Sequence, residues 1–355
     1  MNPIEEMATL PCAHGGPAGR AQLRAAPEDF LVQEWLGWDA DGAGDHLLLR
    51  VRKRGANTLW VAKQLARLAK VDPRDVGFAG LKDRDAVAEQ AFTLPARSAI
   101  GDAWLGVSGD GFEVIAAARH RRKLKRGALK GNDFTIVLRA FTGDIAALEQ
   151  RLRAISGAGV PNYFGPQRFG RDGSNLRTAL AWFSGEAAPA DRWQRGFALS
   201  AARAAIFNAV VAQRVRDGTW NRLLPGEVVN LDGTGSVFVA DSVDATLEER
   251  CARLDVHPSG PMWGGPTSAA GAAAALEADV AARYDVLAHG LSVARLEPER
   301  RALRMRVDCL EWTIEADVVS LRFRLRRGAF ATAVVHELID NAWGQGSDGS
   351  DEVME

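Results

Sequence analysis

The feature of this sequence that most constrains its fold is the change of residue pattern along the chain. Residues 133–139 and 321–326 alternate apolar and polar side chains with the period of two that marks a half-buried strand. Residues 200–218 and 269–282 lie between them and instead have helical spacing or composition, with Ser200 as the expected start of the first helix and Ser268 as a possible N-cap of the second. At 355 residues the chain is long enough for two domains. The pattern therefore predicts an α+β domain with a second domain inserted into it.

Shorter segments add detail to this outline. Asn57 is a suitable N-cap for a helix that runs to about Lys70. Residues 76–79 and 86–93 have strand composition and flank the loop at 80–85. Near the C-terminus, residues 331–338 could form a helix, and the proline- and glycine-rich residues 258–266 are expected to form a loop.

The loop at 80–85 contains a candidate catalytic carboxylate, Asp83. A loop between two strands is a common place for a rigid scaffold to present a reactive side chain. The adjacent Lys82 would help to keep the carboxylate ionised, and such a group can act as a base, a nucleophile or a stabiliser of a developing cation. On the residues alone Asp85 is an equal candidate, and an ordinary solvated hairpin is the more frequent meaning of such a loop.

A basic segment at 119–130 is the second candidate functional feature. The net charge of the chain is only −1, but four acidic residues lie in a C-terminal tail at 341–355 that we expect to be disordered. A run of cations with no acidic residue among them favours contact with a nucleic-acid backbone over a merely solvated face. Its members are Arg119, Arg121, Arg122, Lys123, Lys125, Arg126 and Lys130.

Aromatic residues beside Gly, Pro and Arg form a third group. Residues 160–170 hold three aromatic side chains, which could either stack on RNA bases or anchor a packed connection. Phe330 follows Gly328 and could be a stacking platform, although a lone Phe is more often part of a core. Asn132 could read the edge of a base, but Asn after Gly is also ordinary turn chemistry.

Motifs of cofactor- and metal-dependent enzymes are absent from the sequence. It has no phosphate-binding loop, dinucleotide fingerprint or Gly-x-Ser-x-Gly elbow, and its three cysteines lack zinc spacing. No apolar run reaches the roughly 18 residues of a membrane span, and the N-terminus lacks signal-peptide features. We therefore expect a cytoplasmic protein with no cofactor, metal or membrane partner, whose chemistry falls to carboxylates.

Six segments, taken in order, resemble the TruD family of tRNA pseudouridine synthases. Each segment alone is weak, but their shared order across most of the chain makes the combination specific. They are Pro27-Glu28-Asp29-Phe30, Phe78-Ala79-Gly80-Leu81-Lys82-Asp83, Ala128-Leu129-Lys130-Gly131-Asn132, residues 160–170, Ser200-Ala201-Ala202-Arg203 and Phe330-Ala331-Thr332.

The resemblance implies a fold and a function. The fold would be α+β, a pseudouridine synthase catalytic core of antiparallel sheet and flanking helices at 1–158 and 305–340, with a family-specific α/β TRUD domain inserted at 159–304. The activity would be isomerisation of uridine to pseudouridine in tRNA, at position 13, without cofactor or metal. The matching positions are Asp83 as catalytic carboxylate, Phe30, Asn132 and Phe330 in contact with the uridine, and Lys82, Glu34 and Phe134 in supporting roles.

Two other classes of function are compatible with the residues. A non-catalytic RNA-binding protein or tRNA chaperone on the same fold would need the cations at 119–130 but not Asp83. A carboxylate-dependent glycoside or nucleoside hydrolase would need a second carboxylate as acid, and neither Asp85 nor Glu34 is obviously placed for that role. As for assembly, the resemblance implies a monomer.

Overall fold

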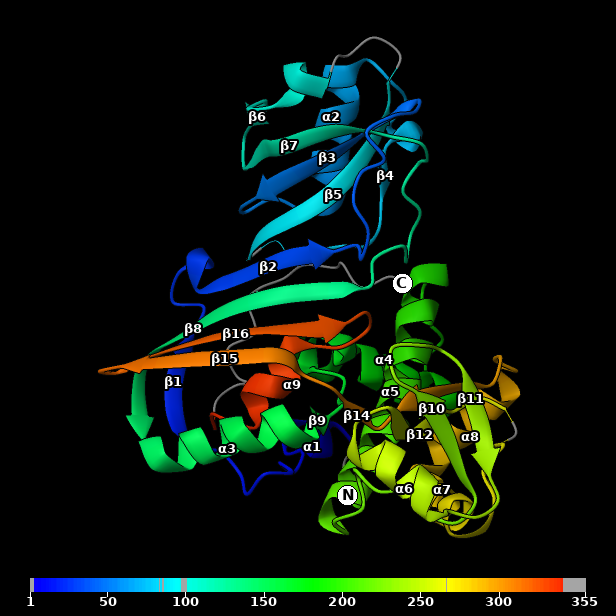
Figure 1. The fold of residues 1–355 in the computed structure, drawn as a ribbon. Helices are drawn as coiled ribbons and strands as arrows, with labels where there is room; N and C mark the ends of the chain where they lie inside the picture. Colours follow the sequence, from blue (N-terminus) through cyan, green and yellow to red (C-terminus); the bar gives the residue numbers. More distant parts are fainter. Residues whose placement is uncertain (1–2, 83, 85, 97–100, 266, 341–355) are drawn as a thin grey trace. The chain divides into compact units, whose positions relative to one another are not determined.

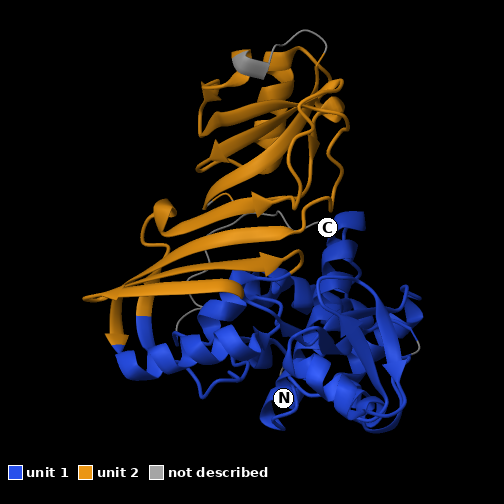
Figure 2. Cartoon of the chain, in the orientation of Figure 1, with its two compact units in different colours: residues 1–20, 143–307, 329–344 blue, residues 21–142, 308–328, 345–355 orange. Residues whose placement is uncertain are grey.

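The chain folds into two compact units, shown in Figure 2. The computed structural model describes residues 3–82, 84, 86–96, 101–265 and 267–340. Unit 1 comprises Met1–Arg20, Gly143–Val307 and Ala329–Gly344, and unit 2 contains Ala21–Thr142 and Asp308–Gly328. These boundaries delimit compact units and do not coincide with the limits at 158/159 and 304/305 that we expected for the inserted domain. Compact units do not test those limits, and the domain organisation stays a prediction.

A large, mostly antiparallel sheet forms the framework of unit 2 (Figure 1). Its strands are β1 (Gly19–Leu23), β2 (Phe30–Trp35), β3 (His46–Lys53), β4 (Gly77–Phe78), β5 (Val87–Pro95), β6 (Ser108–Gly109), β7 (Phe112–His120), β8 (Gly131–Gly143), β15 (Asp308–Glu315) and β16 (Val318–Arg326). They follow the order β15-β16-β8-β2-β5-β3-β7-β6, with β1 on β8 and β4 on β5. The β2–β5 pair is parallel, whereas β8 pairs antiparallel with both β2 and β16.

Local patterns explain the elements of unit 2 that matter for the site. Leu321, Phe323 and Leu325 are buried on one face of β16, as the alternation predicted. Helix α2 (Thr58–Ala69) begins after the expected N-cap, since the Asn57 side chain accepts a hydrogen bond from the Trp60 backbone N–H at 2.7 Å. Its apolar face packs on β3, β5 and β7 in one core cluster. Three short 3-10 helices complete the unit: η1 (Pro27–Asp29), η2 (Pro73–Asp75) and η3 (Gly101–Trp104).

Unit 1 is richer in helix. Its helices are α1 (Pro3–Ala8), α3 (Ile145–Ala158), η4 (Pro166–Phe169), η5 (Arg171–Gly173), α4 (Ser174–Phe183), α5 (Arg192–Arg216), α6 (Ala245–Ala252), α7 (Gly271–Ala282), α8 (Asp285–Val293) and α9 (Ala331–His336). Its strands are β9 (Val160–Pro161), β10 (Glu227–Leu231), β11 (Val237–Ala240), β12 (Val256–Met262), β13 (Glu299–Ala302) and β14 (Arg304–Met305). The four-stranded sheet has the order β11-β10-β12-β13, and β14 pairs with β9.

Helix α5 is the centre of the unit 1 core. Among the described residues it is the one helix long and apolar enough to cross a membrane, but 67% of its apolar stretch is buried inside the protein. Burial of that extent is what the core helix of a folded unit shows. Small side chains such as Ala201 and Ala205 let neighbouring elements approach it closely.

Three local expectations were wrong. Helix α5 begins at Arg192 rather than Ser200, because Asp191 accepts hydrogen bonds from the backbone N–H groups of residues 193 and 194 and caps it earlier. Helix α7 follows Ala270 and is not capped by Ser268. Most of the expected loop at 258–266 is strand. Strand β12 pairs with β10 up to Pro258 and with β13 from Ser259 onwards. Each part of β12 therefore has a partner on one side, and a proline, which lacks an N–H, removes few of the hydrogen bonds between strands.

Candidate active site and nucleic-acid interface

One face of the unit 2 sheet gathers several of the residues that match the family. In the β2–β8 ladder, Glu34 lies opposite Asn132 and Phe30 lies opposite Ile136. Directly opposed residues of an antiparallel pair point to the same face, and so do residues two apart along one strand. The register therefore brings Phe30, Glu34, Asn132 and Phe134 together on that face.

The aromatic residues of this face form a packed row. The rings of Phe30 and Phe134 meet edge to face with centroids 6.1 Å apart, and those of Phe134 and Phe323 stack at 5.5 Å. Phe30 is only 4% exposed, and the Arg24 guanidinium lies 4.2 Å from its ring centroid. In this conformation Phe30 is thus a covered ring rather than an open platform for a base.

An ion pair holds the chain just before Phe30. Arg139 donates to both carboxylate oxygens of Asp29, with distances from 2.7 to 3.0 Å, and the Ala26 backbone N–H donates to the same group at 2.9 Å. The hydrogen bond from Arg139 lowers the pKa of Asp29, so this carboxyl group stays ionised at neutral pH. The start of β2 is fixed as a result.

A second, buried ion pair fixes the loop that precedes Asp83. Lys82 Nζ lies 2.9 Å from Glu34 Oε1, and the two side chains are 7% and 0% exposed. The other carboxylate oxygen, Glu34 Oε2, accepts a hydrogen bond from the Ala91 backbone N–H at 3.0 Å. Because both oxygens have donors, the charge is tolerated away from water. The pair ties the loop to the middle of the sheet.

Polar side chains also hold the backbone of this loop. Thr58 Oγ1, at the start of α2, accepts from the Lys82 backbone N–H at 3.0 Å and donates to Gln90 Oε1 at 2.9 Å. Gln90 Nε2 donates to the Gly80 carbonyl at 2.5 Å, and Lys53 Nζ donates to the Lys82 carbonyl at 3.1 Å. Sequence reasoning did not single out Lys53, Thr58 or Gln90, because their roles arise from contacts between distant segments.

Asp83 and its competitor Asp85 lie outside the described residues. Their described neighbours are well connected: Lys82 pairs with Glu34, and Arg84 Nε donates to the Gly55 carbonyl at 3.2 Å. The Lys82 ammonium group therefore has a partner 48 residues away in sequence. Its observed part is to position the loop that carries Asp83.

Asn132 has an unused hydrogen-bond acceptor. Its Oδ1 atom is buried and has no hydrogen-bond partner among the residues that the structure describes. Buried amide groups are normally hydrogen-bonded, so an orphaned acceptor on the same face as Glu34 is unusual. The oxygen and nitrogen of this amide are exchangeable assignments, and either atom offers a polar contact for a ligand.

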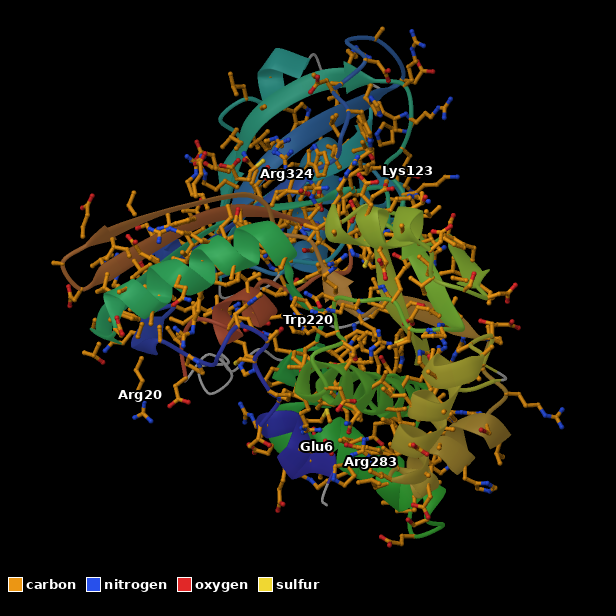
Figure 3. All side chains as sticks on the ribbon, turned by 60° about the horizontal axis from the view of Figure 1, so that its bottom comes forward. Glu6, Arg20, Lys123, Trp220, Arg283 and Arg324 are labelled. Carbon is orange, nitrogen blue, oxygen red and sulfur yellow. The ribbon has the colours of Figure 1, made fainter. Side chains whose placement is uncertain are left out.

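The basic segment at 119–130 borders the same loop. Its chain is anchored there, because the Gly127 N–H donates to the Ala79 carbonyl at 2.7 Å and the Leu124 N–H donates to Thr93 Oγ1 at 2.8 Å. Lys123, labelled in Figure 3, is one of its exposed cations. The Arg126 guanidinium lies 4.1 Å from the centroid of the Phe78 ring. Six of the seven cations are exposed: Arg121, Arg122, Lys123, Lys125, Arg126 and Lys130.

The remaining sequence candidates belong to unit 1. Phe330 precedes α9 and packs on Phe164, with ring centroids 5.8 Å apart, and the Arg301 guanidinium lies over the Phe164 ring at 4.2 Å. Tyr163 and Phe169 are 1% and 4% exposed. The aromatic residues of 160–170 therefore anchor a packed connection, which is one of the two alternatives that the sequence left open.

No group of three or more His, Cys, Asp and Glu side chains is placed to hold a metal ion in the part of the chain that the structure describes. The buried polar groups around Lys82 are instead satisfied by one another. What this site can supply is a fixed loop, an amide oxygen without a partner among the described residues, and a neighbouring group of exposed cations.

Comparison with known proteins identifies the family. The model of the family described as tRNA pseudouridine synthase D (TruD) matches residues 12–179 and 191–338. The tRNA pseudouridine synthase D of Nitrosococcus oceani is 46% identical over 333 residues, covering 92% of this chain and 93% of that protein. The one from Methylococcus capsulatus is 44% identical over 333 residues, with coverage of 93% and 94%.

A solved structure shows the same fold. It is the crystal structure of a candidate tRNA pseudouridine synthase D from Methanosarcina mazei, with a TM-score of 0.74 and 20% sequence identity. The match covers 94% of this chain and 97% of that one. The α+β fold expected from the sequence is confirmed. On the sequence matches, the chain belongs to the TruD family of tRNA pseudouridine synthases.

Proposed function

We propose that this protein isomerises uridine to pseudouridine in tRNA, at position 13, with Asp83 as the catalytic carboxylate. The observation that carries the proposal is the family match, which extends over residues 12–179 and 191–338 and so includes the whole loop at 80–85. The proposal includes a single chain as the active unit, the cytoplasm as its place of action, and no requirement for a cofactor or metal.

The reaction needs an ionised carboxylate at a fixed position. The N1–C1′ bond breaks, the uracil turns, a C5–C1′ bond forms, the C5 proton leaves and N1 gains a proton, so no atom is gained overall. Asp83 would either stabilise or bond to the cationic C1′, or remove the C2′ proton to give a glycal. Both routes require the Asp83 carboxylate to lie close to the ribose of the target uridine. The Lys82–Glu34 ion pair supports them by holding the neighbouring residue.

Asn132 would bind the edge of the uracil. A side-chain amide can accept the uracil N3–H through its oxygen and donate to a ring carbonyl through its nitrogen, and the Oδ1 atom of Asn132 has no partner among the described residues. Filling an orphaned acceptor with a ligand donor removes an energetic penalty and so favours the base that carries that donor. The exposed cations at 119–130 would contact the tRNA phosphates.

The test is release of tritium from C5-labelled uridine in tRNA, with wild type, Asp83→Asn and Asp85→Asn compared. We expect wild type and Asp85→Asn to release tritium, and Asp83→Asn to bind tRNA normally without turnover. Near-normal turnover by Asp83→Asn would remove Asp83 from the mechanism. A wild-type protein that binds tRNA but releases no tritium would instead indicate the non-catalytic RNA-binding alternative.

A further inference from the structure

The loop at 36–45, between β2 and β3, interleaves with the basic segment. The Lys130 backbone N–H donates to the Trp35 carbonyl at 2.9 Å, and the Gly42 N–H donates to the Arg119 carbonyl at 3.0 Å. Arg119 Nη1 in turn donates to the Gly44 carbonyl at 3.2 Å. The Arg119 end of the basic segment is thus tied to this loop, and the Lys130 end is tied to Trp35, the last residue of β2 directly before it, so the loop lies beside the basic segment.

Trp38 is an exposed aromatic residue within this loop. Its indole stacks on the imidazole of His120, with ring centroids 4.7 Å apart and planes 7° from parallel. The Nδ1 atom of His120 lies 2.8 Å from Asp41 Oδ2, and its side chain is 11% exposed. The same carboxylate oxygen of Asp41 accepts a hydrogen bond from the Arg121 backbone N–H at 2.9 Å. One face of the indole is therefore supported, while 37% of Trp38 stays open to solvent.

We infer that Trp38 is a stacking platform for an unpaired base of the RNA substrate. An indole fixed on one face keeps the other face ready for a second ring, without the entropy loss of ordering a free side chain. The ring under Trp38 belongs to His120, which lies in sequence between Arg119 and Arg121 and is followed by Arg122. These cations can contact the phosphates on either side of a stacked nucleotide. Aromatic rings set among cations are the usual construction of single-strand binding surfaces.

The other large exposed apolar side chains in the described part of unit 2 differ from Trp38. Leu59 and Leu68 lie on α2, and Leu105 follows η3, so none of these three belongs to the loop tied to the basic segment. None of them has a π face. This inference rests on the proposed function, because it takes the RNA substrate from there, but it assigns a site and residues that the family match does not.

The test compares Trp38→Ala, Trp38→Leu and Trp38→Phe in binding to a substrate tRNA transcript over a series of salt concentrations. Base stacking on one aromatic ring typically changes affinity by about 5- to 150-fold. For a platform supported on one face we expect about tenfold weaker binding for Trp38→Ala and Trp38→Leu, and near-normal binding for Trp38→Phe. The slope of log affinity against log salt should stay unchanged, because no cation is removed.

Controls separate this inference from folding and from the proposed function. Circular dichroism melts verify that each variant is folded, and Leu105→Ala should bind tRNA as wild type does. The proposed activity is checked first, by tritium release from wild type and none from Asp83→Asn. If Trp38→Ala then binds tRNA as tightly as wild type, the stacking platform is refuted while the activity stands. Loss in Trp38→Phe as large as in Trp38→Ala would also overturn it, since a ring would then not suffice.

Discussion

The buried Lys82–Glu34 pair makes the sharpest prediction about the active loop. Lys82→Met leaves the Glu34 carboxylate, whose side chain is 0% exposed, with the Ala91 N–H as its remaining described donor. Removing one partner of a buried ion pair destabilises a protein by about 3–5 kcal/mol. That is a large part of the roughly 5–15 kcal/mol by which native proteins are stable. We therefore expect a lower urea midpoint, measured by far-UV circular dichroism.

The double variant Lys82→Met/Glu34→Leu is the matched control for this prediction. It removes both charges and fills the same space with apolar groups, which is often close to neutral. Among the described residues, the Ala91 N–H is left without its acceptor, at a penalty of about 1–3 kcal/mol. We expect the double variant to be at least as stable as Lys82→Met, although it carries two substitutions. If the loss of stability in the double variant equals the sum of the losses in Lys82→Met and Glu34→Leu alone, the two side chains do not interact.

The same variants can be compared in their rate of turnover. Because the pair holds the residue next to Asp83, its loss should move the carboxylate, and a displacement of about 1 Å can reduce the rate about 100-fold. Single-turnover tritium release at saturating enzyme measures that step apart from tRNA binding. A Lys82→Met protein with wild-type stability and wild-type turnover would refute the positioning role of the pair.

Two further predictions concern the basic segment and a buried histidine. Replacing Arg121, Arg122 and Lys123 together with Ala should lower the magnitude of the salt slope of tRNA binding by about 2–3, since each phosphate contact contributes about 0.7–0.9. An unchanged slope would mean a merely solvated surface. Burial lowers the pKa of His336 from 6.5 to about 4, and its Nε2 lies 2.9 Å from the Leu10 carbonyl. The unfolded chain therefore binds a proton that the folded chain does not, so wild-type stability should fall by about 3 kcal/mol relative to His336→Gln as the pH drops from 7 to 4. Parallel pH profiles of the free energy of unfolding would contradict this.

Some elements could be predicted from the sequence because their causes are local. The start of α2 follows from one side chain, Asn57, bonding to a backbone N–H three residues away. The buried face of β16 follows from strict alternation between residues 321 and 326. Local signals also misled at α5, which begins at Arg192 after the N-cap Asp191 and not at the expected Ser200.

The composition of the site was decided by tertiary structure. The motif pointed to Lys82, but nothing local says that its ammonium group pairs with Glu34 or that Thr58 and Gln90 hold the loop. The stacking of Trp38 on His120 is equally invisible in the sequence. The residue pattern of a strand indicates which of its sides is buried, whereas the order and register of the strands determine which side chains become neighbours. Those depend on the free energy of the whole sheet, and only the folded chain settles them.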